Sequence, residues 1–216
     1  MQRTILRKTA RTVGVDTVAG SSTDIATKLV HLNVGVAIFR IGDMSTELAL
    51  LDPLAKTVLQ FCRLLLPDDH VRLFEVRSLD EFTEFWKDSH RAFRHVVLIG
   101  HGAANSIKFR VNSVPADLIG LALSEATQNK VVLSLCCETG RAAFAREISM
   151  YARVDAFIGP FGSIHGADAS RFVQDFFGRA LLDGSTTKTA FKLAASGSSK
   201  KVRFRLWRAG RLESDS

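Results

Sequence analysis

Short apolar runs recur along this chain, and they constrain its fold more than any other feature of the sequence. They are rich in Val, Ile, Leu and Phe, and there are five of them: Val36–Ile41, Val71–Val76, Val96–Ile99, Val131–Cys136 and Ala156–Ile158. Such runs show little alternation of apolar and polar side chains, which is typical of strands buried on both faces of a parallel sheet. The run at 71–76 fits least well, because Arg72 and Glu75 interrupt it.

Helical patterns lie between the apolar runs. Asp52 before Pro53 is typical of an N-cap and a first helical residue, and predicts a helix over Leu54–Leu66. Ser78 and Glu81 form a capping box that begins a second helix. Amphipathic spacing marks three more helices: around Phe144–Tyr151, over Phe172–Leu181, and over Thr187–Ala195. Strands that alternate with helices predict an α/β sandwich.

Length and composition limit the class of protein. The 216 residues suit one domain, and 46% hydrophobic with 24% charged residues excludes disordered, collagen-like and coiled-coil chains. No apolar stretch approaches the ~20 residues that a membrane-spanning helix needs. The start of the chain lacks the apolar core of a secretory signal. Three cysteines, two of them adjacent, cannot form a disulfide framework. We therefore expect a single domain over residues 1–216 in a reducing compartment, the cytoplasm.

The excess positive charge lies in two terminal segments, residues 1–34 and 200–216. Residues 1–12 carry four basic and no acidic side chains, and residues 200–216 carry six basic and two acidic ones. The rest of the chain is nearly neutral, which excludes a basic nucleic-acid module. The ends are either a solvated rim or a weak contact surface for nucleic acid or another acidic partner. Alternation over Lys201–Trp207 predicts a half-exposed edge strand, whereas residues 1–34 show no clear pattern.

Two predicted strands end in residues that carry chemistry. His101 lies between Gly100 and Gly102 after one strand, and Cys137 follows another strand where a helix begins. Ligands of parallel sheets bind beyond the carboxyl ends of the strands. A nucleophilic cysteine reacts as its thiolate, which a helix start favours, and a neighbouring imidazole acts as base and proton carrier. Glycines let a substrate backbone approach closely, and the N–H of Gly102 is a candidate oxyanion donor.

Each signal alone is more often structural than functional. A histidine after a strand is commonly a packing residue, and Cys62 and other buried cysteines usually act as small core residues. Three other chemistries fit less well. An α/β-hydrolase would need its serine where Gly102 stands, and a cysteine phosphatase would need arginine where Ala142 or Ala143 stands. The Cys and His residues have no zinc-ligand spacing.

The two strand ends together resemble the CHAT group of caspase-like cysteine peptidases, relatives of caspases, separases and gingipains. The matching segments cover roughly residues 96–195: Gly100-His101-Gly102, Cys137-Glu138-Thr139-Gly140, the strand Val154–Gly159, the loop Pro160–Asp168, Phe176-Phe177 and Leu181-Leu182. The resemblance implies a caspase-like three-layer α/β/α sandwich with a mostly parallel central sheet.

The resemblance also implies roles for single residues. His101 is expected to be the general base and Cys137 the nucleophile, with the N–H groups of Gly102 and Cys137 forming the oxyanion hole. Leu135 and Cys136 depart from the family, which usually has a small residue before the nucleophile. The implied activity is cleavage of a protein or peptide substrate, without cofactor or metal, under the control of a protein partner. The alternative from another class is a non-catalytic interaction module that keeps the caspase-like fold.

Three residues near these strand ends have two interpretations each. Asp168 either caps the helix that starts near Ala169 or projects into the pocket, where its carboxylate would attract a basic P1 side chain. Glu138 either lines the site or favours the helix N-terminus, as any acid would. His165 belongs either to a loop or to the site.

Overall fold

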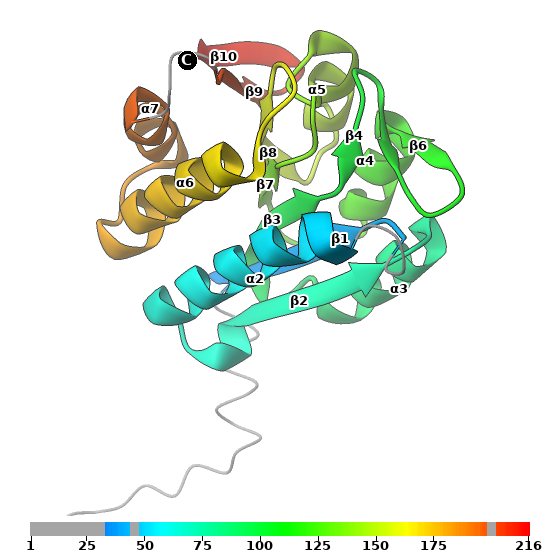
Figure 1. Ribbon diagram of the computed structural model, residues 1–216, viewed down its shortest axis with the longest axis horizontal. Helices are drawn as coiled ribbons and strands as arrows, with labels where there is room; N and C mark the ends of the chain where they lie inside the picture. Colours follow the sequence, from blue (N-terminus) through cyan, green and yellow to red (C-terminus); the bar gives the residue numbers. More distant parts are fainter. Residues whose placement is uncertain (1–32, 44–47, 198–201) are drawn as a thin grey trace, which may run out of the picture.

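One seven-stranded sheet organises the chain (Figure 1). The computed structural model describes residues 33–43, 48–197 and 202–216. The strands of the sheet are, in chain order, β1 (Gly35–Ile41), β2 (Val71–Val76), β3 (Phe93–Ile99), β7 (Lys130–Ser134), β8 (Val154–Pro160), β9 (Phe204–Arg208) and β10 (Arg211–Asp215). Across the sheet their order is β10-β9-β8-β7-β3-β1-β2. The first five in the chain are parallel, and β9 and β10 are antiparallel to their neighbours. The predicted mostly parallel sheet is confirmed.

Six α-helices in the described ranges cover the two faces of the sheet (Figure 1). One face carries α2 (Leu48–Leu65), α6 (Gly166–Phe177) and α7 (Thr187–Gly197). The other face carries α3 (Leu79–Ser89), α4 (Ala116–Ser124) and α5 (Ala142–Ser149). A π-helical turn over Gly178–Leu182 follows α6, and a short 3-10 helix over Asp68–His70 precedes β2. The three-layer sandwich is therefore confirmed. None of the described helices is long and apolar enough to cross a membrane.

Burial of both sheet faces explains why the strand sequences lack polar alternation. In β1, the ring of Phe39 packs against Phe82 and Trp86 of α3, with ring centroids 4.5 and 6.2 Å apart. Its neighbours Val36 and Ile38 lie in the separate core on the side of α2. Successive side chains of a strand point to opposite faces, so both faces need apolar residues when helices cover both.

Helix α2 does not begin at Asp52. It already includes Leu48, so Asp52 and Pro53 lie inside the helix and the predicted N-cap is wrong. The Asp52 carboxylate instead pairs with the Arg40 guanidinium at 2.5 Å and with the Lys56 ammonium at 2.7 Å. Arg40 is buried in β1, and a buried cation without a counter-charge is costly. This ion pair, and not a cap, explains the aspartate.

The strand predicted at the edge of the sheet is not an edge strand. β9 pairs with β8 on one side and with β10 on the other, because the chain reverses at Ala209 and Gly210, both of which have positive φ. Arg203 and Arg205, on the polar side of the predicted strand, pair with Asp215 at 2.5 and 3.0 Å. The basic C-terminal segment therefore neutralises part of its own charge. Residues 1–32 of the N-terminal segment lie outside the described residues.

A small antiparallel sheet follows β3. Its strands are β4 (His101–Gly102), β5 (Ser106–Lys108) and β6 (Ser113–Pro115), in the order β4-β5-β6. His101 lies opposite Lys108, and Gly102 lies opposite Ile107. Ile107 is fully buried in the core on the side of α4. The small sheet therefore anchors the segment that carries His101 and Gly102 to the main body.

Candidate active site

The ends of β3 and β7 place His101 and Cys137 at the same edge of the sheet. The two strands are parallel neighbours, and Leu98 of β3 lies opposite Ser134 of β7. His101 lies three positions after Leu98, and Cys137 lies three positions after Ser134, so both follow the carboxyl end of a strand within three residues. Both residues are half-buried. The structure thus puts the members of the predicted dyad on adjacent strand ends.

Gly102 joins the two strand ends by a close backbone contact. A Cβ atom on Gly102 would lie 2.4 Å from the carbonyl oxygen of Cys137 and 2.8 Å from the Cβ of Cys136. These distances are far below van der Waals contact, so no side chain fits here unless the Cys136–Cys137 backbone moves. The two residues predicted to supply the oxyanion hole are therefore in direct contact.

The two adjacent cysteines have different surroundings. The Cys136 Sγ is fully buried, 3.7 Å from the carbonyl oxygen of Leu98, and burial raises the pKa of this thiol to about 12. Cys137 is half-buried, with its Sγ 4.0 Å from the carbonyl oxygen of Ile164. Within the described part of the chain, the backbone N–H of Cys137 has no hydrogen-bond acceptor. Cys137 is therefore less buried than Cys136 and has a backbone donor that no described residue uses.

Glu138 holds the turn after Cys137 in a left-handed backbone conformation. Its φ is +63°, which costs a non-glycine residue roughly 1–2 kcal/mol. Its N–H donates to the carbonyl of Gly162 at 3.1 Å, and its carboxylate pairs with Arg141 at 3.0 Å. Helix α5 begins at Ala142, so Glu138 precedes the helix and is not in its first turn. The interpretation of Glu138 as a residue of the helix N-terminus is therefore wrong, and a role in the site stays a prediction.

The loop between β8 and α6 packs against this turn. It carries Phe161, which the sequence analysis did not identify. The Phe161 ring is surrounded by the guanidinium groups of Arg141, Arg203 and Arg205, at 5.2, 5.2 and 3.9 Å from its centroid. Such cation–π contacts stabilise by about 0.5–1 kcal/mol each at exposed sites. The Phe161 N–H also donates to the carbonyl of Arg203 at 2.8 Å. No local sequence signal links these distant segments, so only the fold reveals the cluster.

The turn that carries Cys137 ends at Gly140, where two strands hold it. The Gly140 N–H donates to the carbonyl of Pro160 at 2.7 Å, and the Trp207 indole of β9 donates to the Gly140 carbonyl at 3.2 Å. A Cβ on Gly140 would lie 2.2 Å from the carbonyl oxygen of Gly159. The glycine is therefore required by the close approach of β8.

Asp168 does not cap helix α6. The helix begins at Gly166, and its N-cap is His165, whose Nδ1 accepts a hydrogen bond from the Ala167 N–H at 3.3 Å. The predicted capping role of Asp168 is therefore wrong, because the helix starts three residues earlier than expected. Asp168 is a half-buried residue of the first turn, four positions after Ile164, which borders the Cys137 sulfur.

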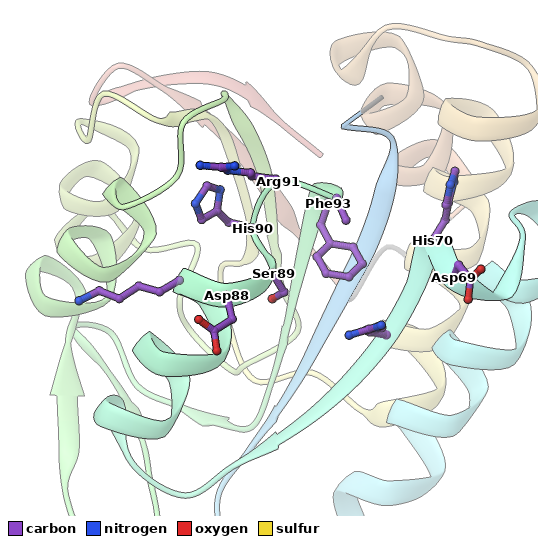
Figure 2. A pocket seen from close by; sticks show the side chains of 10 residues that line it. Asp69, His70, Asp88, Ser89, His90, Arg91 and Phe93 are labelled. Carbon is purple, nitrogen blue, oxygen red and sulfur yellow. The ribbon is translucent and has the colours of Figure 1, made fainter. Parts of the chain in front are cut away.

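A cavity of about 710 Å³ lies at the opposite end of the sheet. Figure 2 shows His90 and Arg91 on one side of it and His70 and Asp69 on the other, with Phe93 between them. Phe93 begins β3 and His101 follows its far end, roughly 25 Å away at ~3.3 Å per residue. The cavity is therefore separate from the candidate site. Among the described residues, no group of three or more His, Cys, Asp or Glu is placed to hold a metal ion.

No protein-family model and no curated protein matches the chain, whereas several solved structures do. A secreted C11 cysteine protease from Bacteroides thetaiotaomicron, in complex with an irreversible peptide inhibitor, has a TM-score of 0.59 and 12% identity over 82% of this chain and 66% of that chain. A second structure of a secreted C11 protease from the same organism, iotapain, has a TM-score of 0.55 and 10% identity over 82% and 67%. The Arg-specific cysteine proteinase gingipain R has a TM-score of 0.50 and 11% identity over 80% and 45%.

The extent of these matches defines what they establish. This chain spans about two thirds of the length of the C11 proteases and less than half of the gingipain chain. At identities of 10–12% the similarity concerns the arrangement of helices and strands. This chain has the caspase-like α/β fold of these cysteine proteases.

Proposed function

We propose that this protein is a caspase-like cysteine endopeptidase of the CHAT type, with His101 as general base and Cys137 as nucleophile. The observation that carries the proposal is the joint placement of these residues. Both follow neighbouring parallel strands, and Gly102 packs against the Cys137 carbonyl while the Cys137 N–H has no acceptor among the described residues. The fold shared with C11 proteases and gingipain R supports the same class of reaction.

The proposed reaction is acyl transfer in two halves. In the first, His101 takes the thiol proton, the Cys137 sulfur bonds to the scissile carbonyl carbon, and the carbonyl electron pair moves to oxygen. The N–H groups of Gly102 and Cys137 bind this oxyanion. The carbon–nitrogen bond then breaks, and His101 gives its proton to the leaving amine. In the second half a water loses a proton to His101 and attacks the thioester, and the carbon–sulfur bond breaks with return of that proton to sulfur.

The proposed substrates are protein or peptide chains with a basic P1 side chain. A desolvated cation needs a counter-charge, and Asp168 is the sole acid in residues 160–170. Support for its role comes from Ile164, which lies four residues before Asp168 in the loop that precedes α6 and whose carbonyl oxygen borders the Cys137 sulfur. Glu138 is already paired with Arg141, so Asp168 is the better candidate for this contact.

The setting of the enzyme is also part of the proposal. We place it in the cytoplasm, and this is supported by its three cysteines, which are all free thiols. A protein partner is proposed to control the activity, since an unregulated endopeptidase would endanger the cell that makes it. Weak binding of nucleic acid is proposed for the two basic terminal segments, and chiefly for the N-terminal one, because arginines of the C-terminal segment pair with Asp215 and Glu213. The chemistry needs no cofactor.

A peptide-library cleavage profile with three alanine variants tests the proposal. Cys137→Ala and His101→Ala should each abolish cleavage with the fold intact by circular dichroism, because neither side chain belongs to the core. Cys136→Ala is the matched control one residue away, and it should retain most of the activity. An inactive Cys136→Ala variant together with an active Cys137→Ala variant would show that Cys136, and not Cys137, is the nucleophile. A wild-type protein that cleaves no peptide and leaves a thiol-alkylating probe unreacted would favour the non-catalytic interaction module.

A further inference from the structure

Two buried hydroxyl groups lie directly behind Cys137, and the proposed reaction does not use them. They belong to Ser134, the last residue of β7, and Thr139, both of which are fully buried. The Thr139 Oγ1 lies 2.8 Å from the Ser134 Oγ and 2.8 Å from the carbonyl oxygen of Cys136. The Cys136 N–H lies 3.3 Å from the Ser134 Oγ. The two hydroxyls therefore contact both backbone polar groups of the residue that precedes the nucleophile.

The contacts of this cluster form a ring that begins and ends on Cys136. A carbonyl oxygen can only accept, so the Thr139 hydroxyl is the donor to the Cys136 carbonyl. The same hydroxyl also points at the Ser134 Oγ, and the Cys136 N–H donates to that oxygen. Among the described residues, Thr139 is the one donor to the Cys136 carbonyl, so loss of its hydroxyl leaves a buried acceptor without a partner, which is unfavourable.

The ring fixes the orientation of the peptide unit between Cys136 and Cys137. Peptide units are planar, and this one is trans, so its C=O and N–H point in opposite directions. The C=O points to Thr139 in the buried interior. The N–H at the other end of the same plane is the Cys137 N–H, which has no acceptor within the described residues. A hydrogen bond to the carbonyl also polarises the N–H and strengthens it as a donor.

The backbone of β8 packs closely against Thr139 and fixes its position. A Cβ on Gly159 of β8 would lie 3.0 Å from the Thr139 Oγ1 and 2.9 Å from the Gly140 nitrogen. β8 therefore carries a glycine where the threonine approaches it, and any larger residue would press on the hydroxyl. The Gly140 N–H bond to Pro160 holds the far side of the turn.

We infer that Thr139, supported by Ser134, is a positioning residue that orients the Cys137 N–H as the oxyanion donor. It acts through the Cys136–Cys137 peptide plane and never contacts the substrate. The inference rests on the proposed peptidase function and adds to it the device that preorganises one half of the oxyanion hole. Loss of one well-placed donor typically lowers kcat by about 10²–10³-fold, and a donor that is present but misaligned costs less.

The test compares Thr139→Val, which removes the hydroxyl at constant shape, with Thr139→Ser, which keeps it. Thr139→Val should lower kcat by about 10–100-fold with KM changed less than about twofold, because the loss falls on the transition state. Thr139→Ser should restore kcat to within about threefold of the wild type. Ser134→Ala leaves the bond from Thr139 to the Cys136 carbonyl in place, so its effect should be smaller. If Thr139→Val does not fold, Ser134→Ala is measured in its place.

Two inhibitors separate orientation of the N–H from general damage to the site. A peptide aldehyde forms a tetrahedral adduct whose oxygen needs the oxyanion hole, so Thr139→Val should weaken its binding by the same factor as kcat. Iodoacetamide alkylates the sulfur without an oxyanion, so its rate at Cys137 should change less than about twofold. An unchanged kcat in Thr139→Val, or equal losses in cleavage and alkylation, would overturn the inference.

A readout without activity keeps the inference distinct from the proposed function. The amide ¹H–¹⁵N signal of Cys137 reports the orientation and polarisation of its N–H in the resting protein. Thr139→Val should shift this signal, whereas Cys62→Ala, a buried thiol in the other core, should leave it in place. If the wild-type protein cleaves nothing and Thr139→Val still shifts the Cys137 signal, the peptidase proposal fails but the orientation of the N–H by Thr139 stands. A Cys137 signal that does not move would remove the ring itself.

Discussion

The two ends of the sheet differ in a way that is informative about where chemistry takes place. The amino end has the cavity of about 710 Å³, bordered by His70 and His90. Both ends have crowded backbone: a Cβ on Gly35 at the amino end would lie 2.5 Å from the His70 carbonyl oxygen, and a Cβ on Gly102 at the carboxyl end would lie 2.4 Å from the Cys137 carbonyl oxygen. Each end also has a non-glycine residue with positive φ, Asn33 at one and Glu138 at the other. Crowding alone therefore does not distinguish the ends. The neighbouring side chains do, because Asn33 bonds the buried ammonium of Lys130, whereas Glu138 follows the thiol of Cys137.

Buried charge at the amino end serves the fold. The ammonium of Lys130 donates to the Asn33 side chain at 2.7 Å and to the carbonyls of His90 and Phe93 at 2.6 Å each. All three of its protons are therefore used, although burial lowers its pKa to about 7. A fully bonded ammonium has no donor left for a ligand. The group ties together the segments that begin β1 and β3.

The largest expected effect comes from adding one methyl group at each end. Gly102→Ala should lower kcat/KM by about 100-fold or more, since its Cβ would displace the Cys137 carbonyl. Gly35→Ala is the matched change at the amino end, where the Cβ would lie 2.5 Å from the His70 carbonyl. It should cost about 1–3 kcal/mol of unfolding free energy but leave kcat/KM of the folded protein unchanged. Equal kinetic losses in the two variants would erase the distinction between the ends.

The second effect is a pH dependence of stability that belongs to the amino end. Burial of His95 against the rings of Phe176 and Phe177 lowers its pKa to about 3. Below about pH 6.5 the unfolded chain binds a proton here that the folded chain rejects, so folding weakens as the pH falls toward 3. This residue should account for about 2 kcal/mol between pH 6.5 and 5. Urea unfolding at both pH values should show that His95→Leu loses this slope, and parallel curves for the two proteins would contradict the assignment.

A smaller effect concerns one carboxylate at each end. Asp168→Asn should lower kcat/KM by about 10-fold on substrates with Arg or Lys at P1 and leave neutral substrates unaffected, as expected for one charge-assisted contact. Asp88→Asn changes a carboxylate that lines the amino-end cavity, and it should alter neither set. An equal loss on all substrates would point to loop order at Asp168, and no loss would remove Asp168 from the site.

The smallest effect is expected from residues 1–12, which precede β1 in the sequence. Replacement of Arg3, Arg7, Lys8 and Arg11 by glutamine should weaken any nucleic-acid binding and reduce its dependence on salt. Cleavage of a small peptide should stay the same, because none of the four residues belongs to the proposed site. Binding that is identical before and after replacement would exclude the N-terminal segment as the contact surface.

Local patterns in the sequence were sufficient for the five parallel strands, for five of the six described α-helices and for the placement of His101 and Cys137 on neighbouring strand ends, but they did not predict α4, β10 or the small sheet. They failed where a side chain serves a distant partner. Asp52 looks like a helix N-cap in the sequence, but in the structure its carboxylate is the counter-charge of Arg40, which is buried in β1. Asp168 looks like an N-cap in the sequence because aspartate is a common capping residue. The structure has His165 as the N-cap instead, and histidine is a less common residue at that position.

Other features of the site depend on contacts that no local pattern encodes. The exposed side of β9 looks like an open edge until β10 folds back on it. The arginines around Phe161 come from separate segments, so their convergence follows only from the sheet order. Ser134 and Thr139 resemble ordinary small polar residues in the sequence, and their hydrogen-bond ring is apparent only once the turn is folded.

The Trp207 contact with Gly140 has a consequence for how the protein is made. The ribosome synthesises His101 and Cys137 well before β9, yet the indole that holds the Cys137 turn arrives only with that late strand. Chains emerge from the ribosome in order, and a domain folds as a unit once its parts are available. A nascent chain therefore carries both reactive side chains without the strand that secures their turn. The proposed cleavage activity would therefore require synthesis of the chain past residue 207.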